Sequence, residues 1–207
     1  MIQVLLVDDH EVVRSGYRRL LENTSDIRVI AEAKSGEEAY TACLKHQPDV
    51  VVMDLSMPGI GGLEAVRKIR HRDKTVRVLV FSMHESETFL TRALEEGVLG
   101  YITKRSAAKV MVEAIRQVAQ GKQFIGQEMQ AYLTKKDSSF LSETLSPREF
   151  EIFLLLAEGK SVNDVADLLR LSSKTVGNHC TSIKNKLNIS NASELTRLAI
   201  REGLLEP

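Results

Sequence analysis

In residues 1–120, short apolar runs alternate with longer segments whose apolar positions recur at helical spacing. The runs are rich in Val, Ile and Leu, which is typical of parallel strands buried on both faces by amphipathic helices. The expected strands are Ile2–Val7, Ile27–Ala31, Val50–Met53, Val76–Phe81 and Leu99–Ile102, and the expected helices are His10–Asn23, Gly36–His46, Leu63–Arg70, Ser86–Glu96 and Ala107–Gln120. The pattern therefore predicts an α/β unit built on a five-stranded, doubly wound parallel sheet.

The pattern changes after Gly121. No strong period runs through residues 122–143, although Gln127–Thr134 could form a short helix. The polar run Lys135–Ser139 is typical of a linker. We therefore expect a first domain over 1–121, a linker over 122–143 and a second domain over 144–207.

The second domain shows helix starts at short intervals. Ser146 is suited to cap a helix, Pro147 to occupy its first turn and Glu149 to complete a capping box. Further starts lie at Ser161 with Asp164, at Ser172–Thr175, and at Asn191 with Glu194. Four short helices predict a small all-α domain. The tight turn between Val162–Leu169 and Ser172–Leu187 is typical of a helix-turn-helix.

The segment Ser172–Leu187 has two chemically different faces. Val176, Cys180, Ile183 and Leu187 recur at helical spacing and predict the buried stripe. The opposite face is small, polar or cationic, which suits a DNA major groove lined by phosphates and base edges. Its residues are Lys174, Gly177, Asn178, Thr181, Lys184 and Asn185.

The charge distribution is more informative than the total charge. The formal net charge is zero, so the chain as a whole is not a strongly basic nucleic-acid binder. Leu168–Asn191 nevertheless contains no Asp or Glu and carries four cations, Arg170, Lys174, Lys184 and Lys186. This stretch is locally cationic on a neutral protein. Charge alone fits a solvated helix face equally well.

Composition indicates the class of protein and its cellular location. Its 43% hydrophobic and 27% charged residues are typical of a globular protein. The sequence has no apolar run long enough to span a membrane and no N-terminal secretory pattern. Cys43 and Cys180 lie far apart, so we expect no disulfide. These features predict a cytoplasmic protein that does not associate with membranes.

Polar side chains follow four of the predicted strands. Asp8 and Asp9 follow the first strand, Asp54 the third, Ser82 the fourth and Lys104 the fifth. If the first and third strands are neighbours, three carboxylates meet where open parallel sheets bind ligands. Their mutual repulsion would be relieved by Mg²⁺, which prefers oxygen ligands. The sequence therefore predicts a phosphoryl group held against Mg²⁺, with Lys104 and Ser82 as further partners.

Four motifs resemble those of the response-regulator receiver domain, which has a flavodoxin-like fold. They are Val-Asp-Asp-His at 7–10, Met-Asp-Leu-Ser-Met-Pro-Gly at 53–59, Phe-Ser at 81–82 and Gly-Tyr-Ile-Thr-Lys at 100–104. The resemblance implies that Asp54 accepts phosphate from a sensor histidine kinase. It also implies Mg²⁺ ligation by Asp54, by Asp9 directly, by Asp8 through water and by the backbone carbonyl of Ser56.

The same resemblance gives roles to three further residues. Ser82 and Tyr101 would form a switch pair, in which Ser82 moves toward the phosphoryl group and Tyr101 rotates inward. Lys104 would be the phosphate partner. Such a change is a population shift between two packings of the domain.

The second domain resembles the LuxR-type DNA-binding domain. The strings are Leu-Ser-Pro-Arg-Glu at 145–149, Ala-Glu-Gly-Lys-Ser at 157–161, Val-Ala at 165–166, Leu-Ser-Ser-Lys-Thr-Val at 171–176, Asn-His at 178–179 and Lys-Leu at 186–187. Both domains together resemble the NarL/FixJ class of response regulators. This implies binding to double-stranded DNA, as a homodimer when phosphorylated. The expected DNA-binding residues are Lys174, Thr175, Asn178, Thr181, Lys184 and Lys186.

One position departs from the LuxR pattern. Members often carry a longer polar or basic side chain where this chain has Gly177. Glycine weakens the helix by about 1 kcal/mol relative to alanine and removes a potential DNA contact. Thr181 and Lys184 would then carry more of the binding.

The sequence thus predicts a phosphorylation-controlled transcriptional regulator of a bacterial two-component system. It is not expected to be an enzyme, except that it assists phosphotransfer to, and dephosphorylation of, its own Asp54. A dehalogenase-like phosphatase is excluded because Asp8 is followed by Asp9 and His10 rather than by a second Asp two residues on. The alternative is a protein-interaction module whose helical domain binds a protein, which salt-dependent DNA binding would distinguish.

Overall fold

This computed structural model of the 207-residue chain describes residues 1–133, 140–169, 171–202 and 204–205. The chain divides into two compact units, Met1–Lys135 and Lys136–Pro207. The predicted polar linker Lys135–Ser139 lies outside the described residues, as does Arg170. The division into 1–121, 122–143 and 144–207 therefore stays a prediction.

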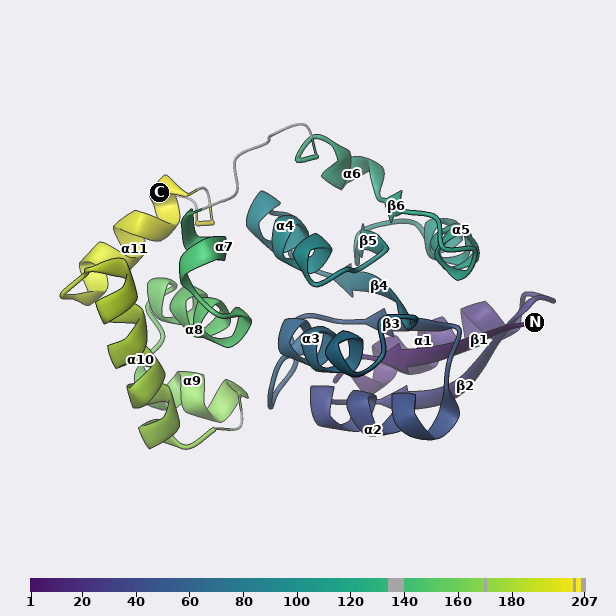
Figure 1. Ribbon diagram of the computed structural model, residues 1–207, viewed down its shortest axis with the longest axis horizontal. Coiled ribbons are helices and arrows are strands. Elements are labelled where there is room, and N and C mark those ends of the chain that lie inside the picture. Colours follow the sequence, from purple (N-terminus) through teal and green to yellow (C-terminus); the bar gives the residue numbers. More distant parts are fainter. Residues whose placement is uncertain (134–139, 170, 203, 206–207) are drawn as a thin grey trace. The chain divides into compact units, whose positions relative to one another are not determined.

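The first unit contains a parallel sheet with helices on both faces (Figure 1). Its strand order, β2-β1-β3-β4-β5-β6, confirms that the first and third strands are neighbours. The strands are β1 (Ile2–Val7), β2 (Ile27–Ala33), β3 (Val50–Met53), β4 (Arg77–Ser82), β5 (Gly100–Thr103) and β6 (Phe124–Ile125). The helices are α1 (Glu11–Glu22), α2 (Gly36–His46), α3 (Gly62–Arg72), α4 (Glu87–Glu95), α5 (Ala108–Ala119) and α6 (Gln127–Gln130).

Side-chain alternation along the strands explains why both faces need cover. One core cluster joins Val4, Leu6, Val50 and Val52 to α1 and α5, while Leu5 and Val51 between them are equally buried. A strand that is buried on both faces loses its amphipathic pattern, which is why the apolar runs were continuous. The doubly wound α/β prediction is confirmed.

The sheet has a sixth strand that the sequence pattern did not predict. β6 is only two residues long and pairs with β5 through Gly100 and Tyr101. It is followed by α6, whose Met129 is fully buried. Part of the predicted linker 122–143 is therefore packed against the first unit. Two residues are too few for alternation to be visible in a sequence.

The second unit is all-helical, as predicted. Its helices are α7 (Phe140–Thr144), α8 (Pro147–Ala157), α9 (Val162–Leu169), α10 (Ser173–Leu187) and α11 (Ala192–Arg201). The four predicted helices correspond to α8 through α11, and α7 is an addition. The capping box at Ser146 forms with Glu149, and Gly159 ends α8 with φ +87°. α8 packs against α9, α10 and α11, so it forms the centre of this unit.

Among the described residues, no helix is long and apolar enough to cross a membrane. Cys43 and Cys180 are both free thiols, and burial raises the pKa of Cys43 to about 12.

Candidate functional site

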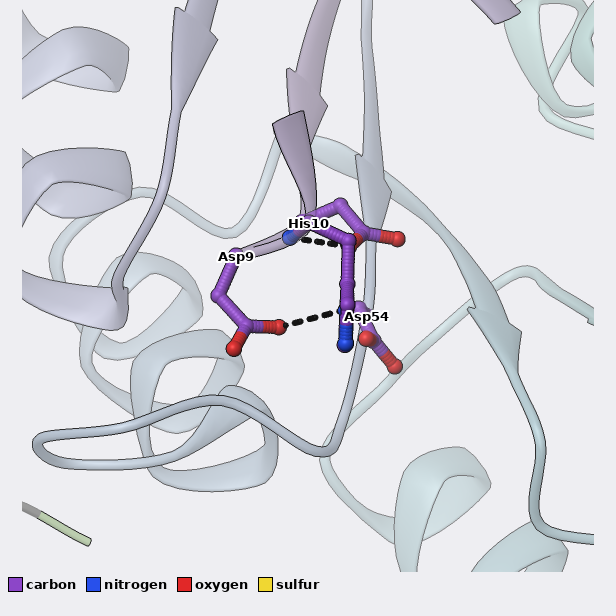
Figure 2. A group of neighbouring side chains, drawn as sticks. Asp9, His10 and Asp54 are labelled. Carbon is purple, nitrogen blue, oxygen red and sulfur yellow. Dashed lines mark hydrogen bonds and ion pairs between the residues drawn. The ribbon is translucent and has the colours of Figure 1, made fainter. Parts of the chain in front are cut away.

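The carboxyl ends of β1 and β3 bring three aspartates together. Val7 pairs with Met53 across the two strands, so Asp8 and Asp54 leave the sheet side by side. Asp54 N–H also donates to the carbonyl of Val7 at 2.9 Å. Ligand atoms of Asp8, Asp9, His10 and Asp54 all lie within 4.8 Å of one another. Figure 2 shows Asp9, His10 and Asp54 gathered at these strand ends, with Asp9 joined to His10.

Lys104 links two of these carboxylates. It follows β5, and its Nζ lies 2.6 Å from Asp8 Oδ2 and 2.7 Å from Asp54 Oδ2. The side chain of Asp54 is only 2% exposed and that of Lys104 is 12% exposed. Water therefore screens the pair weakly, and Lys104 provides most of the positive charge that keeps both aspartates in place.

Burial dominates the protonation of Asp54. It raises the pKa of Asp54 to about 6, although the charge and hydrogen bond of Lys104 act in the opposite direction. Burial also tends to lower the pKa of Lys104, but Asp54 and Asp8 outweigh it and the pKa of Lys104 is raised. An anionic Asp54 beside a cationic Lys104 is the form expected at neutral pH.

The oxygens of this cluster suit a hard divalent cation. Asp9 Oδ1 is buried and accepts no hydrogen bond from the described residues, and the buried Asp8 Oδ2 has the Lys104 ammonium as its partner. Lys104 Nζ lies 2.6 Å from Asp8 Oδ2, and His10 Nδ1 lies 3.0 Å from Asp9 Oδ1. Buried carboxylate oxygens without hydrogen-bond donors are unfavourable unless a cation binds them. The donor set therefore fits Mg²⁺, whose preferred ligands are oxygens.

Ser82 and Tyr101 lie beside the cluster and share a backbone partner. Ser82 is fully buried at the end of β4, where its Oγ accepts a 3.3 Å hydrogen bond from the His84 N–H. The Tyr101 hydroxyl donates to the His84 carbonyl at 2.9 Å, and burial raises the pKa of Tyr101. Tyr101 is already turned inward, because its side chain is completely buried.

Two histidines of the site received no role from the sequence. His10 contacts both Asp8 and Asp9. The ring of His84 stacks on Phe89 with centroids 3.7 Å apart, and its Nε2 lies 2.7 Å from Ser56 Oγ. His10 belongs to the Val-Asp-Asp-His motif at 7–10, so the sequence already indicated that it lies beside the aspartates. Nothing in the sequence indicated that His84 and Ser56 meet, because their loops are joined only in the fold.

The second candidate site is the outward face of α10. Val176, Ile183 and Leu187 are buried, as predicted, and Cys180 is partly buried. Lys174, Asn178, Thr181 and Asn185 are exposed, and Lys184 is half-buried on the same side. Ser172 caps the helix by accepting a hydrogen bond from the Thr175 N–H at 3.0 Å. The structure therefore presents one continuous polar and cationic helix face.

Glu149 joins α10 to the start of α8. Its side chain is 7% exposed, and its carboxylate accepts hydrogen bonds from Ser182 Oγ and Lys186 Nζ, both at 2.6 Å. It also accepts from the Ser146 N–H at 2.8 Å, completing the capping box. These bonds outweigh the effect of burial and lower the pKa of Glu149 to about 2.

Comparisons with known proteins agree with this geometry. Residues 4–116 match the model of the response regulator receiver domain family, which covers more than half of the chain. Residues 143–199 match the family of bacterial regulatory proteins called the luxR family. The chain belongs to the response regulators.

Two curated response regulators and one solved structure show the extent of the similarity. UvrY from Escherichia coli K12 is 42% identical, over 99% of this chain and 96% of its own. GacA from Pseudomonas aeruginosa is 39% identical, over 100% of this chain and 99% of its own. A structure of the two-component response regulator RcsB in complex with DNA is 28% identical, with a TM-score of 0.62 over 95% of this chain and 96% of that chain.

The structure brings the predicted residues of this response regulator's first unit together. Asp8, Asp54 and Lys104 are in direct contact, and Asp9 belongs to the same cluster. The Ser56 N–H donates to Asp54 Oδ1 at 3.2 Å, which places Ser56 in the loop beside the acid. Ser82 and Tyr101 meet through the His84 backbone. The chemical roles assigned to these residues stay predictions.

Lys186 differs from the other residues predicted to bind DNA. Lys174, Asn178, Thr181 and Lys186 are all exposed on α10, but of these four it is Lys186 that forms an ion pair with Glu149. The ion pair was not visible in the sequence, because the charges along a helix do not reveal which cations have partners. The lysine lies on the side of α10 that faces α8.

Gly177 lies in open space on α10. A Cβ placed there would meet no other atom within 4 Å, and the Thr181 hydroxyl donates to the Gly177 carbonyl at 3.1 Å. Close packing therefore does not require glycine at this position. The helix-weakening effect inferred from the sequence has no compensating contact among the described residues.

Glu149→Gln is expected to destabilise the second unit by about 3 kcal/mol at pH 7, because it removes the carboxylate whose hydrogen bonds lower its pKa in the folded state. An acid whose folded pKa lies below its ordinary value stabilises the fold above that ordinary value. The difference between wild type and variant should therefore be full above pH 4.5 and disappear as the pH falls through about 2. Urea unfolding of the full chain, followed by NMR signals of α8 and α10, measures it.

Asp167→Asn is the matched control, since Asp167 is an exposed acid on α9 of the same unit. It should change the unfolding free energy by less than about 0.5 kcal/mol. Equal effects of the two variants at pH 7 would contradict a special role for Glu149.

Proposed function

We propose that this response regulator is a DNA-binding transcriptional regulator controlled by phosphorylation of Asp54. The observation that carries the proposal is the buried contact of Asp54 with Lys104 and Asp8, at the strand ends of a unit joined to a luxR-family unit. Asp54 supplies a nucleophilic carboxylate oxygen, and the Lys104 ammonium beside it can neutralise a negatively charged phosphoryl group.

Asp54 acts as the phosphoacceptor in this proposal. One carboxylate oxygen attacks the phosphorus of a phosphohistidine on a sensor histidine kinase. The phosphorus–oxygen bond forms, the phosphorus–nitrogen bond breaks, and the electron pair stays with the departing imidazole. Lys104 then neutralises a phosphoryl oxygen, and the Ser82 hydroxyl donates a hydrogen bond to another. The regulator thus assists phosphotransfer to Asp54 and its later hydrolysis, without acting on other substrates.

Mg²⁺ is the cofactor of this step. The acidic cluster supports a cation site. By resemblance to the receiver family, Asp9 and Asp54 would bind the ion directly, Asp8 would bind it through water, and the backbone carbonyl of Ser56 would be a further ligand. When bound, the ion neutralises charge that develops on the transferring phosphoryl group. The chain's own residues position the acceptor oxygen and exclude bulk water around it.

Phosphorylation changes the packing around Asp54. It adds nearly two negative charges and three acceptor oxygens to a buried position. Ser82 turns toward the phosphoryl group, so its hydrogen bond from the His84 N–H is exchanged for a new one. The Tyr101 hydroxyl donates to the carbonyl of the same His84, so a shift of His84 changes the hydrogen bond and the packing of Tyr101. The resulting population shift favours a homodimer that binds double-stranded DNA in the bacterial cytoplasm.

α10 is the proposed recognition helix. The proposed DNA contacts on this helix are Lys174, Thr175, Asn178, Thr181 and Lys184. Lys186 contributes positive charge at the edge of this DNA-binding face. The RcsB–DNA complex supports binding of DNA by a chain of this architecture. The alternative function, a protein-interaction module, is disfavoured because the outward face of α10 is polar and cationic rather than apolar.

Lys184→Gln is expected to weaken DNA binding and its dependence on salt. Each lysine that neutralises a phosphate releases counterions, so its loss should lower the slope of log affinity against log salt by about 1. Titration of the phosphorylated protein with duplex DNA at several salt concentrations measures this slope. The loss of affinity should be similar for unrelated sequences.

Lys45→Gln provides the same chemical change on exposed α2 of the first unit. It should leave the salt slope unchanged. Wild-type binding that does not respond to salt would favour the protein-interaction alternative, and equal slopes for both variants would remove Lys184 from the interface.

A further inference from the structure

The segment that follows α5 is attached to the first unit at several points. β6 extends the sheet beside β5, and the Gly126 N–H donates to the Tyr101 carbonyl at 2.8 Å. Met129 on α6 is fully buried and Ile125 is nearly so. We call residues 124–133 the docking arm. The arm is thus an ordered part of the first unit immediately before the chain enters the second.

The first polar anchor of the docking arm is Glu128. Its carboxylate accepts a 2.9 Å hydrogen bond from Thr103 Oγ1 and a second one from Ser106 Oγ. These hydrogen bonds outweigh burial and lower the pKa of Glu128. Thr103 directly precedes Lys104, whose Nζ contacts Asp54. Glu128 therefore holds the loop that carries the phosphate partner.

The second polar anchor is Tyr132. Its hydroxyl donates to the Glu85 carbonyl at 3.2 Å, in the loop between β4 and α4. The preceding residue, His84, accepts from the Tyr101 hydroxyl at 2.9 Å and donates to Ser82 Oγ at 3.3 Å. Tyr132 is therefore one residue away from the backbone group that Ser82 and Tyr101 share.

The two anchors reach the two loops that must respond to a phosphoryl group. Ser82 and Lys104 come from different strands, yet the docking arm contacts the loop beyond each of them. A second link between these loops is the ion pair of Arg105 with Glu85, at 3.3 Å. Movement of either loop changes the position of the hydroxyl donors that hold Glu128 or of the carbonyl acceptor that holds Tyr132. The arm precedes the second unit along the chain. Its release would therefore detach from the first unit the part of the chain that leads to the second.

We propose that the docking arm reads the state of Asp54: its Tyr132 and Glu128 anchors hold in the unphosphorylated protein, and phosphorylation releases them. This inference rests on the proposed function, since it requires that Asp54 be phosphorylated. Tyr132 acts here as a positioning residue that links the β4–α4 loop to the chain leading into the second unit. Coupling between two sites is reciprocal, so an arm that is weakened by mutation also favours the phosphorylated state.

Hydrogen exchange of the full-length protein tests the docking arm directly. Peptides covering residues 124–133 are followed with and without acetyl phosphate and Mg²⁺, while phosphate on Asp54 is measured by mass spectrometry of the same samples. Phosphodonor should raise exchange of the arm in wild type and leave it unchanged in Asp54→Asn. Tyr132→Phe should raise exchange about fivefold without phosphodonor, the effect of one neutral hydrogen bond.

Tyr132→Phe should also increase the fraction of Asp54 phosphorylated at limiting phosphodonor, which a purely structural role would not do. Tyr40→Phe is the matched control, because it makes the same change at a partly buried tyrosine on α2 of the first unit. Glu128→Gln should change both readouts in the same direction as Tyr132→Phe. Phosphate on Asp54 without any change in arm exchange would overturn this inference alone. Absence of phosphate on Asp54 would overturn the proposed function and the inference with it.

Discussion

Replacing Asp54 with asparagine is expected to abolish phosphorylation of this response regulator and to stabilise its first unit. The amide has no nucleophilic oxygen anion, so acetyl phosphate and Mg²⁺ should leave no covalent phosphate on the variant. Stability should rise because Asp54 is 2% exposed and lies among other carboxylates. In the absence of a bound cation, an anion at this position is costly.

The pH dependence of this stabilisation follows from the pKa of Asp54. Burial raises that pKa from 3.8 to about 6, so the folded state binds the proton more tightly than the unfolded state. The stability that the proton provides is full below pH 3.8 and is lost as the pH rises through about 6. The advantage of Asp54→Asn should therefore be absent near pH 3.8 and reach about 3 kcal/mol above pH 6.

Urea unfolding in EDTA measures this difference between pH 4 and pH 8, with Glu95→Gln, an exposed acid on α4, as the control. Adding Mg²⁺ should narrow the gap, because a bound cation stabilises wild type by mass action. A variant that still carries phosphate, or that is less stable than wild type at pH 8 in EDTA, would contradict the role assigned to Asp54.

Lys104→Met is expected to have the largest destabilising effect on the first unit. The substitution keeps much of the side-chain volume but leaves Asp8 and Asp54 without the cation that contacts both. Breaking a buried ion pair from one side costs about 3 kcal/mol. Urea unfolding in EDTA at pH 7.5 should show this loss, and Mg²⁺ should restore more stability to the variant than to wild type.

A double-mutant cycle distinguishes loss of the ion pair from loss of packing. In the Asp54→Asn background, Lys104→Met should cost much less than in wild type, because one of the two carboxylates is neutral. Lys109→Met, the same change at an exposed position of α5, should have little effect in either background. An equal cost of Lys104→Met in both backgrounds would show that the lysine contributes by packing alone.

The regular part of the fold was predictable because its pattern is repeated. Five apolar runs and five amphipathic segments predicted the doubly wound sheet, and local cap residues such as Ser146 and Asn191 marked the helices of the second unit. β6 escaped prediction because Phe124–Ile125 gains its strand geometry from pairing with β5 rather than from its own pattern. The docking arm therefore resembled a linker in the sequence.

The candidate site was predictable wherever a residue follows a strand. Asp8, Asp54 and Lys104 meet because neighbouring parallel strands end together, which is a consequence of topology. Contacts between loops were not predictable, and the pairing of His84 with Ser56 is one example. Contacts between helices were equally hidden, because the ion pair of Lys186 with Glu149 depends on how α10 packs against α8.

The central claim is that phosphate on Asp54 controls DNA binding. The most direct test is retention of a genomic DNA library by the full-length protein, with and without acetyl phosphate and Mg²⁺, for wild type and Asp54→Asn. We expect phosphodonor to increase retention of specific fragments by wild type and to leave retention by Asp54→Asn unchanged. Equal retention by both proteins in every condition would contradict the claim.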